Sequence, residues 1–79
     1  MSISKQSAQA IGEAIDNAAG ELPCNYEILI LIEGGGMVCK LICPDGEVET
    51  FIYCNLDESI VEAVARANEI ERNKDEANQ

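Results

Sequence analysis

The sequence predicts an α+β fold with the element order α-β-β-β-α, in which two helices pack on one face of a three-stranded antiparallel sheet. Three observations predict this fold. Apolar residues recur at helical spacing near both ends, the middle of the chain holds three short apolar segments, and Gly34–Gly36 and Pro44–Gly46 separate those segments with turn residues. The chain has 79 residues, so we expect one domain over residues 1–73 and a frayed polar tail over residues 74–79.

The first helix is predicted over residues 4–19. Ser2 or Ser4 can cap its beginning, and Gly20 followed by Pro23 predicts its end. Its apolar stripe consists of Ala8, Ile11, Ile15, Ala18 and Leu22. Because alanines are part of this stripe, the helix can approach its support closely.

Three strands are predicted over residues 26–33, 37–43 and 47–54. The first is apolar on both faces, which is typical of a central strand or of a strand whose second face is covered by another element. Glycine accepts positive φ at low cost, so residues 34–36 predict a hairpin turn. Pro44, Asp45 and Gly46 predict the second turn, in which proline presets φ and glycine takes the left-handed position.

The second helix is predicted from Asp57, which serves as its cap, to about Asn73. Glu58 lies in the first turn, where a negative charge is favourable to the helix dipole. Glu62 and Arg66 are spaced to form an i, i+4 ion pair. The apolar stripe consists of Ile60, Ala63, Val64, Ala67 and Ile70.

The sheet face that points away from the helices is a candidate interface. If Ile28, Ile30 and Ile32 face the helices, the alternation of a strand turns their neighbours outward. The residues then expected on that face are Glu27, Leu29, Leu31, Glu33, Glu47, Glu49, Phe51 and Tyr53. Aromatic and aliphatic side chains with a rim of carboxylates are more typical of an interface than of a solvated sheet. A shift of one residue in the third strand would exchange its two faces, and this alternative stays open.

Charge is the most distinctive feature of the composition. Fifteen acidic residues face five basic ones, for a net charge of -10. Between Gln6 and Ala65 there are eleven acids and a single base, Lys40, so the excess belongs to the segment that folds. Such a field repels nucleic acid and anionic membranes and attracts basic surfaces. The alternative is that the acidity only keeps the protein soluble.

The residue types exclude several kinds of active site. Histidine is absent, so neither a Ser-His-Asp nor a Cys-His arrangement can form. The segment Glu33–Met37 is rich in glycine but lacks the helix and lysine of a phosphate-binding loop, and Asp45–Glu47 is too short for a calcium-binding EF-hand loop. We therefore expect a protein that is not an enzyme and has no cofactor.

Four cysteines, Cys24, Cys39, Cys43 and Cys54, are expected to serve as small buried apolar residues without a metal. A zinc site or a Cys24–Cys54 disulfide is the alternative. The first six residues lack the apolar core of a signal peptide, and the longest apolar run, residues 28–32, is too short to span a membrane. We expect a cytoplasmic protein that does not bind membranes.

Two family resemblances concern topology. The α-β-β-β-α order resembles the double-stranded RNA-binding domain, which implies RNA binding, but Asp57, Glu58 and the neutral Gly34–Gly36 loop occupy the positions where that family carries basic residues. Residues 26–72, with the helix sequence Asp57-Glu58-Ser59-Ile60-Val61-Glu62-Ala63, also resemble HicB-type antitoxins. That second resemblance implies the neutralisation of a toxin.

In size, acidity and lack of catalytic residues the chain resembles the small inhibitors of phages and mobile elements, namely anti-CRISPR and anti-restriction proteins. This resemblance implies an inhibitor that blocks DNA or RNA binding by a host defence complex, with carboxylates in place of phosphates and no direct contact with nucleic acid. A homo-oligomeric adaptor, dimerised through the exposed sheet face, is the alternative. The residues expected to bind the partner are Glu27, Glu33, Glu47, Glu49, Phe51, Tyr53, Asp57, Glu58 and Glu62.

Overall fold

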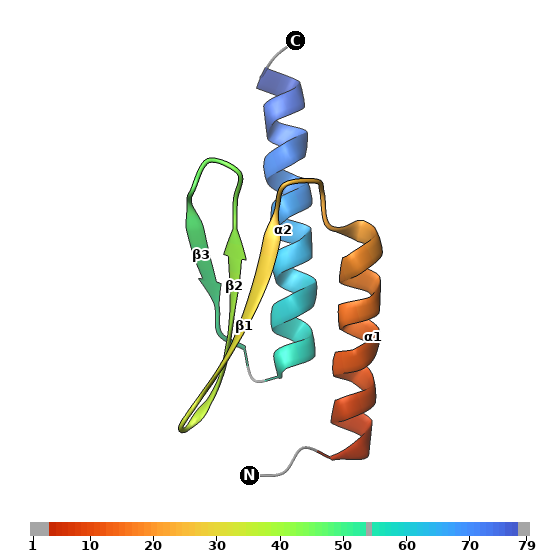
Figure 1. Ribbon diagram of the computed structural model, residues 1–79. Coiled ribbons are helices and arrows are strands. Elements are labelled where there is room, and N and C mark those ends of the chain that lie inside the picture. The colour runs from red at the N-terminus through yellow and green to blue at the C-terminus, as the bar shows by residue number, and fades with distance from the viewer. Residues whose placement is uncertain (1–3, 54, 78–79) are drawn as a thin grey trace.

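The computed structural model describes residues 4–53 and 55–77 and confirms the predicted order α-β-β-β-α (Figure 1). The elements are α1 (Lys5–Glu21), β1 (Glu27–Glu33), β2 (Gly36–Ile42), β3 (Val48–Phe51) and α2 (Leu56–Ala77). The strands form one antiparallel sheet in the order β1-β2-β3. Both outer strands of this sheet, β1 and β3, are therefore edge strands.

Helix α1 begins with the predicted cap at Ser4, whose Oγ accepts a hydrogen bond from the backbone N–H of Ser7 at 3.1 Å. The other cap considered, Ser2, lies outside the described residues. The helix does not end at Gly20 as expected. It continues to Glu21, and the N–H of Leu22 donates to the carbonyl of Ala18 at 2.9 Å.

A two-residue turn joins β1 to β2, with Glu33 directly opposite Gly36. Gly35 has a φ of 117°, a conformation that only glycine adopts without strain, so the turn depends on this residue. Strand β1 pairs along its whole length with β2, whereas β3 pairs only with the four residues from Cys39 to Ile42. The hairpin of β1 and β2 therefore projects beyond the rest of the sheet, as Figure 1 shows.

The second turn sets the register of β3. The N–H of Cys43 donates to the carbonyl of Glu47 at 2.9 Å, so three residues, Pro44, Asp45 and Gly46, form the loop. Gly46 has a φ of 92°, which is the left-handed residue expected in a three-residue hairpin loop. A carboxylate oxygen of Asp45 accepts from the N–H of Glu47 at 3.0 Å and braces the turn.

The core lies between the helix-facing side of the sheet and α2. Cys39 and Leu41 of β2 are fully buried against Ile60, Ala63 and Ala67 of α2. Ile28, Ile30 and Phe51 are half-buried at the margin of this core. The predicted apolar stripe of α2 thus faces the sheet as expected, and the prediction that Ile28 and Ile30 face the helices is confirmed. Ile32 shares their face but is 81% exposed, because the tip of the hairpin projects away from the helices (Figure 1).

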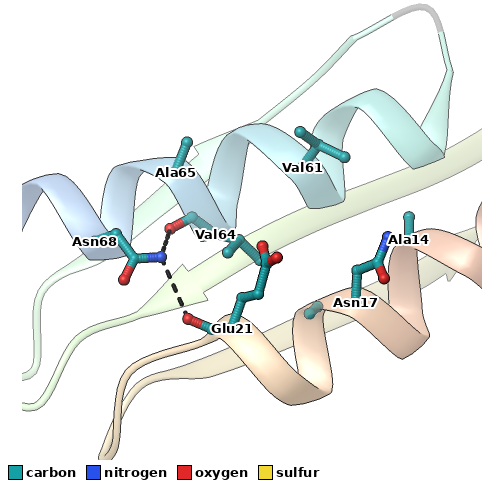
Figure 2. Close-up of a pocket in the computed structure, with 8 residues that line it drawn as sticks. Ala14, Asn17, Glu21, Val61, Val64, Ala65 and Asn68 are labelled. Carbon is teal, nitrogen blue, oxygen red and sulfur yellow. Dashed lines mark hydrogen bonds between the residues drawn. The ribbon is translucent and has the colours of Figure 1, made fainter.

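Helix α1 rests on α2 and hardly touches the sheet. In Figure 1, α1 lies beyond β1, on the opposite side of the molecule from β3. Asn68 joins the two helices, since its side-chain nitrogen donates to the carbonyl of Glu21 at 3.3 Å and to that of Val64 at 3.0 Å (Figure 2). A shallow hollow of about 260 Å³ lies along this helix seam, lined largely by small residues such as Ala14 and Ala65.

Helix α2 continues to Ala77, beyond Asn73, where the periodicity predicted its end. Lys74 pairs with Glu71 at 3.6 Å, and its ammonium group lies 5.9 Å from the ring centroid of Tyr26, so contacts with neighbouring groups support the extra turn. Residues 78 and 79 of the predicted tail lie outside the described residues. None of the described helices combines the length and apolar character needed to cross a membrane.

Candidate partner-binding surfaces

The nine residues predicted to bind a partner do not share one surface. The expectation that Glu47, Glu49 and Phe51 join Leu29 and Leu31 on the exposed sheet face is wrong. Glu49 is directly opposite Leu41 and Phe51 is directly opposite Cys39, and opposed residues point to the same side of a sheet. Glu49 and Phe51 therefore point toward α2, which is the alternative register that the sequence left open.

Glu49 forms an ion pair with a residue of α2, so it is not available at the edge of an interface on the exposed sheet face. The Nε of Arg66 lies 3.1 Å from both carboxylate oxygens of Glu49, and a second guanidinium nitrogen lies 3.5 Å from Glu69. The hydrogen bond to Glu49 raises the pKa of Arg66. The predicted Glu62–Arg66 pair is wrong, because Arg66 turns to Glu49 and Glu69. Phe51 likewise packs against the core and cannot be an exposed anchor.

Four of the predicted residues do come together, where the segment after β3 enters α2. Tyr53, Asp57, Glu58 and Glu62 line a hollow of about 190 Å³ together with Val61, and we call these five residues the acidic hollow. Tyr53 is 48% exposed. Because α2 begins at Leu56, Asp57 lies inside the first turn and is not its cap. The i, i+4 spacing of Glu58 and Glu62 places them on one side of the helix.

The carboxylates of the acidic hollow are not neutralised by a salt bridge within residues 4–53 and 55–77. The side-chain amide of Asn55 donates a hydrogen bond to Glu58 at 3.5 Å, a neutral contact that leaves the charge in place. Arg66, one turn beyond Glu62, is engaged by other carboxylates. Three negative charges thus surround a half-exposed aromatic ring, which is a surface that a cation-rich partner can satisfy.

The sheet face that points away from the helices, here called the outer face, is more apolar than predicted. Glu27, Leu29, Leu31 and Glu33 of β1 lie on it as expected, since each is opposite a β2 residue that also points away from the core. Its other members are Val38, Lys40, Ile42, Val48 and Thr50. Lys40 lies in the middle, between Leu29 and Thr50. The outer face therefore carries two carboxylates, at either end of β1, and one central ammonium group.

Sequence reasoning missed Val48 on the outer face because it placed the third strand one residue out of register. It missed Val38 and Ile42 because it assigned no face to the residues of the second strand. The signal that could have found them is the turn. A Pro-Asp-Gly loop of three residues puts Cys43 opposite Glu47, so Glu47, Glu49 and Phe51 share the side of the buried Cys43. Val61 in the acidic hollow was also missed, since it lies off the apolar stripe of α2.

The cysteines divide between core and surface. Cys39 and Cys43 are buried, as predicted, and burial raises the pKa of both thiols. Cys24 is exposed, so the expectation of burial is wrong for this residue, which lies in the loop between α1 and β1. The alternative disulfide involves Cys54, which lies outside the described residues. Within those residues no three acidic, cysteine or histidine side chains are grouped so as to hold a metal ion.

Comparison with known proteins gives no relative, since no family model, curated protein or solved structure matches this chain.

Proposed function

We propose that this chain is a non-catalytic inhibitor or regulator that binds a basic protein surface. The most specific form of this proposal is an anti-CRISPR-type protein that covers the DNA- or RNA-binding surface of a host defence complex. The observation that carries it is the acidic hollow, where Asp57, Glu58 and Glu62 surround Tyr53 without a cationic partner within the described part of the chain.

Phosphate mimicry provides the physical mechanism. A nucleic-acid-binding surface presents lysine and arginine side chains that normally pair with phosphate oxygens. Glu58 and Glu62, whose Cβ atoms are about 5–6 Å apart on one side of a helix, offer such cations a short row of anionic oxygens. Tyr53 adds an aromatic face on which an arginine guanidinium can stack. The net charge of -10 steers a basic partner toward the molecule at long range.

Two charge-matched variants test the proposal. The hollow variant carries Asp57→Asn, Glu58→Gln and Glu62→Gln, and the control variant carries Glu13→Gln, Asp16→Asn and Glu21→Gln on α1. Each removes three negative charges from a chain of net charge -10, so both differ from the wild type by the same bulk charge. Wild type and variants are immobilised and exposed to host lysate at low and at high salt, and duplex DNA and RNA are used to elute what is captured.

We expect the wild type and the control variant to capture basic nucleic-acid-binding proteins at low salt and to release them at high salt or on addition of nucleic acid. The hollow variant should lose most of this capture while keeping its helical circular dichroism spectrum. Salt-insensitive capture, or capture of no basic protein, would overturn the proposed function. Equal losses in both variants would show that bulk acidity, and not the acidic hollow, is responsible.

A homo-oligomeric adaptor is the second candidate, and the outer face favours it. Leu29 and Val48 on this face are 43% and 52% exposed, and Leu31, Val38 and Ile42 connect them into one apolar surface. Surfaces of this kind often mark protein interfaces. Size-exclusion chromatography with light scattering tests the candidate at increasing protein concentration. A strict monomer at high concentration would remove it.

A further inference from the structure

Strand β1 is an edge strand whose only charged residues, Glu27 and Glu33, lie at its two ends. Its seven residues pair without interruption with β2, and its sequence contains no proline and no internal charge. Natural sheets normally protect such an edge with lysine, proline, a bulge or a covering segment. Among the described strands the outer edge of β1 is unpaired, so it is competent to pair with another strand.

The turn geometry decides which backbone groups the edge offers. A two-residue turn makes Glu33 and Gly36 a hydrogen-bonded pair, so every second residue of β1 directs its backbone toward β2. The alternate residues, Ile28, Ile30 and Ile32, direct their N–H and C=O groups outward. Their side chains point to the helix-facing side of the sheet, where Ile28 and Ile30 meet the core.

An apolar groove lies beside this edge. It has a volume of about 250 Å³, and Ile28 and Ile30 form one wall while Ile15 and Ala19 of α1, with Leu22 just after the helix, form the other. Ile15 is 48% exposed although it belongs to the apolar stripe of the helix. Three strands at about 4.8 Å spacing are narrower than two helices of about 10 Å diameter, so α1 extends beyond the sheet and has no strand above it among the described residues. The groove is the space that a fourth strand would cover.

We propose that β1 and this groove bind an extended segment of a basic partner protein as a fourth, antiparallel strand. Residues of the segment opposite Ile28 and Ile30 would enter the groove and must be apolar. Residues opposite Glu27 and Glu33 would lie on the outer face, where lysine or arginine would pair with the two carboxylates. The basic character of this partner rests on the proposed function, whereas the strand addition rests on β1 and α1 alone.

A second copy of this chain is a poor occupant of the same edge. The sequence of β1, Glu-Ile-Leu-Ile-Leu-Ile-Glu, reads the same in both directions, so two copies could pair antiparallel about Ile30. That pairing would place Glu27 of each copy opposite Glu33 of the other, and like charges directly opposite each other are destabilising. Each copy would also bring a net charge of -10 to the interface. A strand with cationic ends removes both penalties.

The probe for the test is the peptide Lys-Val-Thr-Val-Thr-Val-Lys, which presents valine to the groove and lysine to Glu27 and Glu33. It is titrated into ¹⁵N-labelled protein, and amide shifts are followed. Two backbone-methylated forms provide a matched pair. Methylation of the valine amides removes the hydrogens that would point at β1, whereas methylation of the threonine amides removes those on the far edge. We expect the first form not to bind and the second to bind like the parent.

Two pairs of protein variants complete the design. Ile32→Pro removes one outward N–H, and Ile32→Thr keeps it, while the side chain lost in both is 81% exposed. Ala19→Phe fills the groove, and Ala65→Phe fills the hollow on the helix seam instead. We expect Ile32→Pro to weaken peptide binding roughly fivefold relative to Ile32→Thr, because one hydrogen bond is lost. We expect Ala19→Phe to abolish peptide binding.

Amide shifts should cluster at Ile28, Ile30, Ile32 and the facing side of α1. Shifts confined elsewhere, or equal binding by both methylated peptides, would overturn strand addition. A stable dimer that Ile32→Pro dissociates would overturn the basic occupant in favour of a second copy. The inference and the proposed function fail separately. If Ile32→Pro captures basic proteins as well as the wild type does, only the edge site is contradicted. If the peptide binds at β1 but no basic protein is captured, only the proposed function is contradicted.

Discussion

The Nε of Arg66 on α2 lies 3.1 Å from both carboxylate oxygens of Glu49 on β3. This ion pair ties the short edge strand to the helix that covers the sheet, and it requires Glu49 to point toward α2. Both side chains remain more than one-third exposed, so solvent screens their attraction.

We expect the pair to make a small, salt-dependent contribution to stability. Glu49→Gln and Arg66→Gln, combined in a double-mutant cycle, should show a favourable coupling at low ionic strength that shrinks as salt is added. Thermal unfolding followed by circular dichroism provides the measurement. A coupling that does not change with salt would contradict the ion-pair interpretation.

A matched pair of leucine truncations tests the two sheet faces. Leu41 is fully buried against α2 and Leu29 is 43% exposed on the outer face. Leu41→Ala should lower the free energy of unfolding by about 2–5 kcal/mol, whereas Leu29→Ala should cost less than about 1 kcal/mol. Urea unfolding measures both. Equal costs would mean that the outer face is buried in solution by self-association.

Tyr26 offers a test of a buried hydroxyl. Its side chain is buried, and within the described residues no group meets hydrogen-bond geometry with its oxygen, although the carboxylate of Glu71 is a neighbour. Tyr26→Phe removes that oxygen and keeps the ring that Lys74 contacts. We expect the variant to be more stable by about 1 kcal/mol, which for a domain of this size raises the melting temperature by roughly 4–8 °C. A lower melting temperature would show that the hydroxyl makes a stabilising contact.

Tyr26 should also make stability depend on alkaline pH. Burial, together with the neighbouring Glu71, raises its pKa from 10.0 to about 12. The folded state thus holds the proton more tightly, so the contribution is complete below pH 10 and is lost as the pH rises from about 10 to 12. Urea titrations across this range should show that the wild type loses stability as the pH rises and that Tyr26→Phe loses less. The same pH dependence in both proteins would mean that another group is responsible.

The thiols should differ in reactivity. In a Cys54→Ser background, Cys24 should react with a disulfide reagent at once, whereas Cys39 and Cys43 should react only as fast as the protein opens. Burial raises the pKa of both latter thiols, which lowers their thiolate fraction further. Mass spectrometry of timed samples identifies the modified residues. Fast modification of Cys43 would contradict its burial.

Much of the fold was predictable because the relevant interactions are local. Ser4 caps α1 by accepting a hydrogen bond from the N–H of Ser7, only three residues along the chain. The spacing of Ile60, Ala63 and Ala67 likewise marks the face of α2 that is buried. The candidate site was only partly predictable. Asp57, Glu58 and Glu62 belong to one helix, so their clustering follows from sequence spacing, but the approach of Tyr53 depends on the path of the chain after β3.

The sequence by itself therefore determined the order of elements, the two turns, the buried stripe of α2 and the location of the charge excess in the segment that folds. Tertiary structure decided which way β3 faces and where α1 lies. Strand β3 has apolar residues on both faces, so either register buries some of them, and packing of Phe51 against the core together with the Glu49–Arg66 pair selects one. Helix α1 packs on α2 and extends past β1, because two helices are wider than three strands, and this offset leaves both the edge and its groove uncovered by the described part of the chain.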